Sequence, residues 1–211
     1  MARICSLLCG TCALLAVTST SDAQQTTPAD PPRRTVAAAR LADGESITLD
    51  GRLDEAVWLR AVPAADFVQI DPSNGGTPTE RTEVRIAFGR DAFYMGVTNY
   101  DSDPEGWLGF QRRRDEFLGA DDRFMWVIDT FLDSRSGYFF ETNPSGLIAD
   151  SLFGINGDNR QWDGIWNLRV DRSAIGWTIE VEIPFRTLNF NPESDTWEST
   201  SSAPCGARTR K

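Results

Sequence analysis

The chain contains no histidine. Because histidine is the usual general base near neutral pH and a common zinc ligand, a Ser-His-Asp triad and every histidine-dependent metal site are excluded. Basic residues are also few, with 21 lysines and arginines against 31 aspartates and glutamates, and the formal net charge is −10. The composition therefore argues against nucleic acid as a partner, since binding phosphates needs clustered lysine and arginine.

Cysteine is scarce outside the N-terminal region. Three of the four cysteines, Cys5, Cys9 and Cys12, lie close to the N-terminus, and only Cys205 follows them. The rest of the chain therefore cannot form an internal disulfide. A lipid-anchored form would need a box of small residues before Cys9 or Cys12, and Leu8 fits such a box poorly.

Long apolar runs are also lacking, apart from residues 4–17. This stretch is too short to span a bilayer stably, and Arg3 gives it a positively charged start. Ser21 and Ala23 place small residues at positions −3 and −1 of a cleavage site after Ala23. The pattern predicts a signal peptide over residues 1–23 and an exported protein, located in the periplasm, at the cell surface or outside the cell.

The remaining length suits one domain. Residues 24–34 are polar and rich in proline, which predicts an extended linker over residues 24–43. Short apolar segments then alternate with turns rich in Gly, Pro, Asn and Asp, which is typical of an all-β protein. We expect an antiparallel β-sandwich, jelly-roll-like, over residues 44–198, with one or two short helices. The expected strands lie at 82–88, 92–100, 123–131, 137–143, 148–155 and 177–183, and the expected helices at 54–60 and 185–188.

The segment 177–183 shows the clearest strand pattern. Apolar residues occupy every second position, while Thr178, Glu180 and Glu182 share the opposite face, which we expect to be solvated. The two glutamates would lie about 7 Å apart, a separation that a glycoside hydrolase could use. A solvated strand face explains them better, and we assign no catalytic residue.

Three segments together resemble the family 9 carbohydrate-binding modules. They are Ile47-Thr48-Leu49-Asp50-Gly51-Arg52-Leu53-Asp54-Glu55-Ala56-Val57-Trp58, Val127-Ile128-Asp129, and Gly176-Trp177-Thr178-Ile179-Glu180-Val181-Glu182-Ile183-Pro184-Phe185, and the resemblance covers residues 44–192. It implies a β-sandwich that binds a glycan or oligosaccharide, often beside glycosidase domains and sometimes with a structural calcium ion.

Four further motifs are similar to a subgroup in which this module precedes an outer-membrane β-barrel. They are Arg112-Arg113-Arg114-Asp115, Asp129-Thr130-Phe131, Asn143-Pro144-Ser145-Gly146 and Trp162-Asp163-Gly164-Ile165-Trp166. The resemblance therefore implies a membrane barrel, absent from this chain, as a partner.

Two departures stand against this resemblance. Met125 occupies a position where sugar-binding members of the family often carry an acidic residue. After Trp197 the subgroup would continue Trp-Gly-x-Asn-Phe, whereas this chain reads Glu198-Ser199-Thr200. We therefore expect residues 199–211 to be an aberrant tail, produced by a frameshift or truncation that removed the barrel.

The tryptophans supply the candidate sugar-binding residues, because sugars stack on exposed aromatic faces. The patterns around Trp58, Trp126 and Trp177 predict core positions. The alternative role of Trp162 is a loop anchor, and that of the Arg112–Arg114 run is ion pairing with acidic loops. The predicted carbohydrate-binding residues are Trp107, Trp162, Trp166, Arg113 and Asn143.

Acidic loops offer a possible structural calcium site, since calcium takes several oxygen ligands. The candidate ligands are Asp101, Asp103, Asp121 and Asp122. The alternative is turn chemistry, which favours aspartate without any metal.

Three functions remain open from the sequence. The first is a glycan-binding module that serves polysaccharide breakdown by an associated enzyme or barrel. The second is a structural adaptor of an outer-membrane barrel with no sugar affinity, which Met125 favours. The third is a glycoside hydrolase. An exposed Trp162 would favour sugar binding over the adaptor role.

Overall fold

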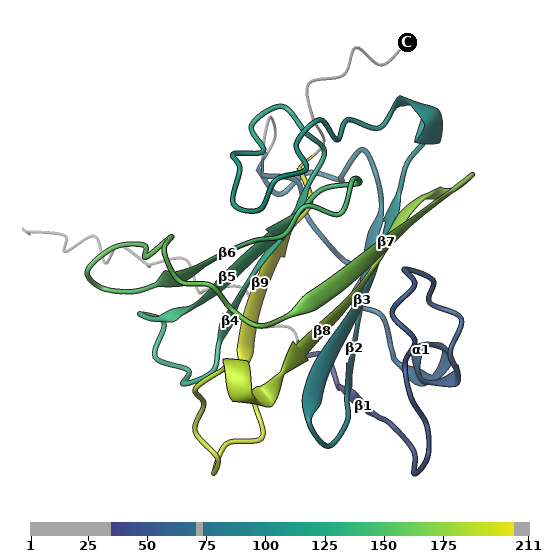
Figure 1. The fold of residues 1–211 in the computed structure, drawn as a ribbon. Helices are drawn as coiled ribbons and strands as arrows, with labels where there is room; N and C mark the ends of the chain where they lie inside the picture. The colour runs from purple at the N-terminus through teal and green to yellow at the C-terminus, as the bar shows by residue number, and fades with distance from the viewer. Residues whose placement is uncertain (1–34, 71–73, 205–211) are drawn as a thin grey trace, which may run out of the picture. The chain divides into compact units, whose positions relative to one another are not determined.

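Two β-sheets make up nearly all the regular structure of the described residues, 35–70 and 74–204, in a computed structural model. The first sheet contains, in spatial order, β1 (Ala39–Arg40), β2 (Thr82–Phe88), β3 (Ala92–Tyr100), β8 (Gly176–Pro184) and β7 (Asn167–Ser173). The second contains β6 (Ala149–Phe153), β5 (Gly137–Thr142), β4 (Phe124–Asp129) and β9 (Glu198–Ser202). The sheets face each other (Figure 1), which confirms the predicted β-sandwich.

Strand pairing follows the alternation of the sequence. The β2–β3 hairpin closes through residues 89–91, and all pairs in both sheets are antiparallel except β1–β2. In the part of the chain that the structure describes, helix is limited to α1 (Ala56–Arg60) and two 3-10 turns, η1 (Pro104–Gly106) and η2 (Phe185–Thr187). The predicted hairpin and the scarcity of helix are both confirmed.

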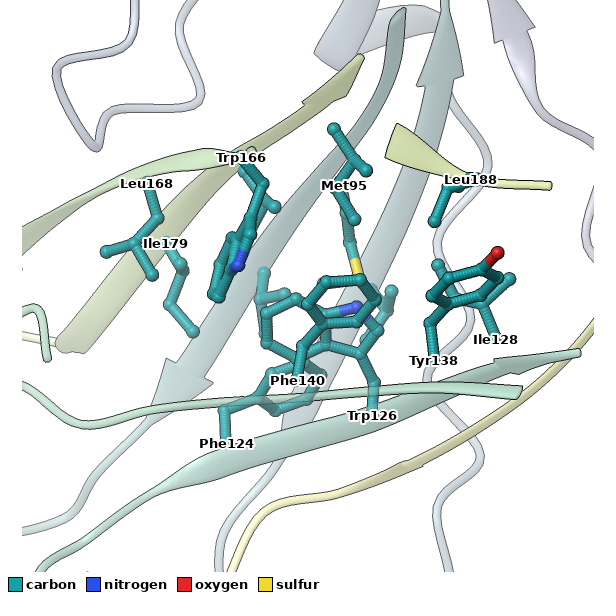
Figure 2. Packing of buried hydrophobic residues seen from close by; sticks show 14 of the residues in the cluster. Met95, Phe124, Trp126, Ile128, Tyr138, Phe140, Trp166, Leu168, Ile179 and Leu188 are labelled. Atoms are coloured by element: carbon teal, nitrogen blue, oxygen red, sulfur yellow. The ribbon is translucent and has the colours of Figure 1, made fainter. Parts of the chain in front are cut away.

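Aromatic side chains fill the space between the sheets. Trp126 of β4 and Phe140 of β5 stack with ring centroids 5.3 Å apart. Trp166 packs edge-on against both rings, at 5.6 and 5.1 Å (Figure 2). Such contacts add to the stabilisation that burial alone provides. Trp58, Trp126 and Trp177 are 2%, 1% and 5% exposed, so their predicted core positions are confirmed.

The outer face of the first sheet corrects a prediction. Glu180, expected to be solvated, is completely buried, because the segment that contains α1 lies across β3 and β8 (Figure 1). The Glu180–Glu182 pair therefore does not stand on an open strand face, and the glycosidase hypothesis loses its candidate carboxylates.

The carboxylate of Glu180 binds this covering segment directly. Its Oε2 atom accepts hydrogen bonds from the backbone N–H groups of Asp50 and Gly51, both at 2.9 Å. Its Oε1 atom accepts a third from Trp58 Nε1 at 3.0 Å. Thr178 of the same strand donates to the carbonyl of Gly51 at 2.6 Å. One strand thus holds the segment at two places, before α1 at Asp50 and Gly51 and within α1 at Trp58.

Gly51 is required where the segment crosses β7. Its φ is +92°, and a Cβ atom there would lie 2.5 Å from the backbone nitrogen of Asp171. Both the backbone conformation and the close approach therefore exclude a larger residue.

The two ends of the domain differ from the predicted boundaries. The expected linker 24–43 contains β1, which pairs in parallel with β2. The expected tail 199–211 contains most of β9, which pairs with β4 from Met125–Ser202 to Asp129–Glu198. Both strands are held by backbone hydrogen bonds, which do not need an apolar sequence pattern. The predicted signal peptide 1–23 lies outside the described residues.

We expect Glu180→Gln to lower the free energy of unfolding by about 2–3 kcal/mol, because an amide cannot satisfy three buried donors. Chemical denaturation would measure this loss. Glu182→Gln is the matched control on the same strand, since Glu182 is only partly buried and accepts from Tyr94 and Asn167. Equal losses in the two variants would contradict the assigned role of Glu180.

The stability should also depend on pH through Glu180. Burial raises the pKa of Glu180 above its ordinary value, although its three hydrogen bonds favour the charged form. The folded state then binds more protons than the unfolded state in the window just above pH 4.5. The contribution of Glu180 to stability therefore falls as pH rises through its folded pKa. In urea titrations from pH 4.5 to 7.5, the stability difference between the wild type and Glu180→Gln should shrink with rising pH; a constant difference would refute this.

Candidate functional site

Asn143 organises one end of the sandwich. Its Nδ2 donates to the carbonyl of Gln111 at 2.8 Å and to Asp121 Oδ2 at 2.7 Å. Its Oδ1 accepts from the backbone N–H groups of Ser145 and Leu147, at 3.0 and 3.1 Å. The side chain is fully buried, so Asn143 supports the turn after β5 and is not exposed to a ligand, which corrects its predicted binding role.

The predicted calcium ligands also serve the backbone. Asp122 accepts from Leu108 N at 2.8 Å, Asp121 from Gln111 N at 3.0 Å, and Asp101 from Asp103 N at 2.9 Å. No group of three or more acidic, histidine or cysteine side chains converges within residues 35–70 and 74–204. The four aspartates do not form a ready calcium centre, so calcium stays a prediction and we base no step on it.

A hollow of about 220 Å³ opens beside the Asn143 turn. It lies between this turn and the edge strand β7, and residues of both elements line it. Its lining residues are Pro144, Ser145, Gly146, Leu168, Arg169, Val170 and Arg172. We refer to it below as the β7 hollow.

Trp107 stands beside the β7 hollow. The guanidinium carbon of Arg172 lies 4.3 Å from the centroid of the Trp107 ring, an arrangement that suits a cation–π interaction. Gly109 packs closely on the same indole, since a Cβ there would lie 3.0 Å from Trp107 Cζ3 and 2.9 Å from Ser145 Oγ. Ser145 Oγ in turn donates to the carbonyl of Gly109 at 2.6 Å. The predicted residue Trp107 therefore belongs to this site, with one ring face already covered by Arg172.

Two arginines that the sequence reasoning missed dominate the chemistry of the β7 hollow. Arg169 donates from Nη1 to the carbonyl of Leu168 at 2.8 Å, which holds its guanidinium at the edge of the sheet. Within the described part of the chain, neither Arg169 nor Arg172 forms an ion pair. The spacing Arg-x-x-Arg on a strand carries no specific signal, so only the structure could reveal the pair.

The other two predicted tryptophans have structural roles. Trp166 is 4% exposed, and its Nε1 donates to Asp150 Oδ2 at 2.6 Å, so it is a core residue and not a binding platform. Trp162 packs against Tyr138 and Phe140, with ring centroids 5.2 and 6.2 Å apart. Trp162 therefore packs its loop onto the core, and it is partly buried.

The arginine run divides between two roles. Arg114 forms ion pairs with Asp150 of β6 at 2.5 Å and with Asp163 at 2.7 Å, so it pairs with carboxylates as expected, although neither lies in the acidic loops considered above. Arg113 is 87% exposed, pairs with Glu116 at 3.3 Å, and does not line the β7 hollow. Burial raises the pKa of Asp150, while Trp166 and Arg114 favour its charged form. This cluster joins two loops and offers no open site.

A second hollow, of about 200 Å³, lies on the outer face of the other sheet. Val127 and Phe153 line it, and the carboxylate of Asp129 at its margin is engaged by the backbone N–H groups of Phe131 and Ser134, at 3.0 and 2.8 Å. By register Met125 shares this outward face with Val127. The remaining lining residues, Ser134, Arg135, Ser136, Glu198 and Thr200, are polar, so this hollow is mixed in character.

None of the helices in the described residues has the length and apolar character needed to cross a membrane.

Comparison with known proteins gives a fold relationship. No known protein family and no curated protein matches the sequence. Among solved structures, a candidate carbohydrate-binding protein from Bacteroides uniformis superimposes with a TM-score of 0.59 at 12% identity, over 79% of this chain and 81% of that one.

Two structures of a family 9 carbohydrate-binding module from Caldicellulosiruptor kristjanssonii are also similar. The complex with cellotriose gives a TM-score of 0.56 at 13% identity, covering 80% of this chain and 76% of that one. The complex with glucose gives 0.54 at 13% identity, covering 81% and 79%. The fold is similar to that of the family 9 modules. At this identity the likeness concerns the fold alone.

We expect Asn143→Asp to destabilise the domain by about 2–4 kcal/mol, because it places a second carboxylate against Asp121 and removes two donated hydrogen bonds. Thermal or urea unfolding at pH 7 would measure the loss. Asn156→Asp, in an exposed turn, is the control and should change stability by less than about 0.5 kcal/mol. A stable Asn143→Asp protein would show that the turn does not depend on this network.

Proposed function

We propose that the protein binds carbohydrate in the β7 hollow. The observation that carries the proposal is the meeting of Trp107, Arg172, Arg169 and Ser145 around this hollow, in a sandwich whose fold resembles sugar-bound family 9 modules. Sugar sites combine an apolar surface with a few placed polar groups. The β7 hollow has both, and Trp107 lies beside it through its contact with Arg172.

The groups around the hollow suit hydroxyl recognition. Planar guanidinium groups donate several N–H bonds in a fixed geometry. Ser145 Oγ donates to Gly109 but keeps acceptor capacity, and the free edge of β7 offers backbone polar groups. The volume of about 220 Å³ is below the range of about 300–1,000 Å³ typical of drug-sized sites, so one or two sugar rings would be in contact.

The biological setting belongs to the same proposal. The N-terminal pattern supports export, to the periplasm, the cell surface or the medium. There the module would serve polysaccharide breakdown by holding a glycosidase or a membrane barrel near its glycan. We assign no catalytic residue, and the chain is proposed as a binding protein.

One observation favours the adaptor role instead. Met125 and Val127 of β4, with Phe153 of β6, place three apolar side chains on the outward face of the second sheet, beside polar residues such as Thr200. A face of this kind suits contact with another protein more than contact with a polar sugar. A folded protein without sugar affinity would therefore support this alternative.

Isothermal titration calorimetry of the purified protein against glucose, cellotriose, xylotriose, mannotriose and trigalacturonic acid tests the proposal. We expect saturable binding of at least one sugar, and Arg172→Ala should weaken it about tenfold or more. Arg160→Ala is the matched control, because Arg160 is exposed and lies outside the hollow. Binding that is insensitive to Arg172→Ala would place the site elsewhere, and the absence of binding to every sugar, including acidic ones, would overturn the proposal.

A further inference from the structure

The β7 hollow contains two positive charges without a carboxylate partner. The chain carries an excess of ten acidic residues, and seven other arginines form ion pairs within its described part: Arg52, Arg60, Arg81, Arg85, Arg113, Arg114 and Arg123. Several exposed arginines are also unpaired, but Arg169 and Arg172 are the two that line one hollow. The hollow is thus a local cationic site on an acidic protein.

Each guanidinium is held in place by a contact that leaves N–H groups available. The guanidinium carbon of Arg172 lies 4.3 Å from the centroid of the Trp107 ring, and this contact consumes none of the Arg172 donors. Arg169 uses Nη1 on the carbonyl of Leu168 and retains its other donors. Both groups are therefore oriented before a ligand arrives, which lowers the entropy cost of binding.

Nearby acidic groups do not neutralise this pair. Asp171 lies between the two arginines in β7 but forms no ion pair with either among the described residues. Asp121, behind the Asn143 turn, is buried and engaged by Gln111 N and Asn143 Nδ2. The positive charge of the hollow is therefore available to a ligand.

We propose that the β7 hollow selects a sugar that carries a carboxylate, namely a uronic acid residue of an acidic oligosaccharide. The inference rests on the proposed carbohydrate function and names its ligand class. A carboxylate accepts paired N–H bonds from arginine, and such charge-assisted bonds are about twice as strong as those to a neutral hydroxyl. Ser145 and the free edge of β7 then contact the hydroxyls of the same ring.

The decisive comparison uses one oligosaccharide in two charge states. Calorimetry at pH 7 would measure trigalacturonic acid, its fully methyl-esterified form, and cellotriose as a neutral trisaccharide. We expect the acid to bind about tenfold or more tightly than the ester. Raising the salt concentration from about 0.05 to 0.5 M should weaken binding of the acid and leave binding of neutral sugars nearly unchanged.

Variants identify the groups responsible. Arg172→Ala and Arg169→Ala should each reduce the preference for acid over ester, and Arg172→Lys should restore it only in part, because lysine keeps the charge but loses the planar fork. Arg160→Ala is the control and should retain the full preference. Circular dichroism of every variant would show that the fold is intact.

The outcomes separate this inference from the function on which it rests. Equal affinity for acid and ester overturns the acidic-sugar inference while carbohydrate binding stands. A preference for the acid that survives Arg172→Ala and Arg169→Ala also overturns it, because another site would then hold the carboxylate. Absence of binding to acid, ester and neutral sugars by the folded protein overturns both proposals.

Discussion

The burial of one carboxylate determines how the first sheet is built. Glu180 lies in the middle of β8, a central strand, and accepts three hydrogen bonds from the segment that carries Trp58. A buried charge or carboxyl group without partners would be strongly destabilising. The covering segment and the central strand therefore need each other: the segment shields Glu180 from water, and Glu180 fixes the position of the segment. Strand β8 is consequently buried on both faces.

The sequence predicted the strands with apolar alternation better than the segments that cover or extend the sheets. The alternation of apolar and polar residues along 177–183 correctly predicted which face of the strand packs on the core. It could not predict that a segment distant in the sequence covers the opposite face at Glu180. Strand β9 was missed because its sequence, Glu-Ser-Thr-Ser-Ser, has no apolar alternation, and its pairing with β4 depends on backbone groups alone. The short β1 was missed for the same reason.

The candidate site was only partly predictable. Trp107 was found because glycines around it suggested an open position, and the structure places it beside a hollow. Asn143 was predicted to contact a ligand. Its turn does line the hollow, but its own side chain is buried. Arg169 and Arg172 were not found. They are notable only because the turn after β5 and Trp107 lie next to β7 in the fold, and a local sequence pattern cannot predict that proximity.

The β7 strand is an edge of its sheet, and such edges expose backbone groups that can pair with another chain. The guanidinium of Arg169 donates a hydrogen bond to the carbonyl of Leu168, the preceding residue of β7. Its positive charge therefore lies along the same edge. A neighbouring molecule that approached as an added strand would have to displace this contact and desolvate the cation. The arginine at the rim therefore also protects the domain against edge-to-edge aggregation.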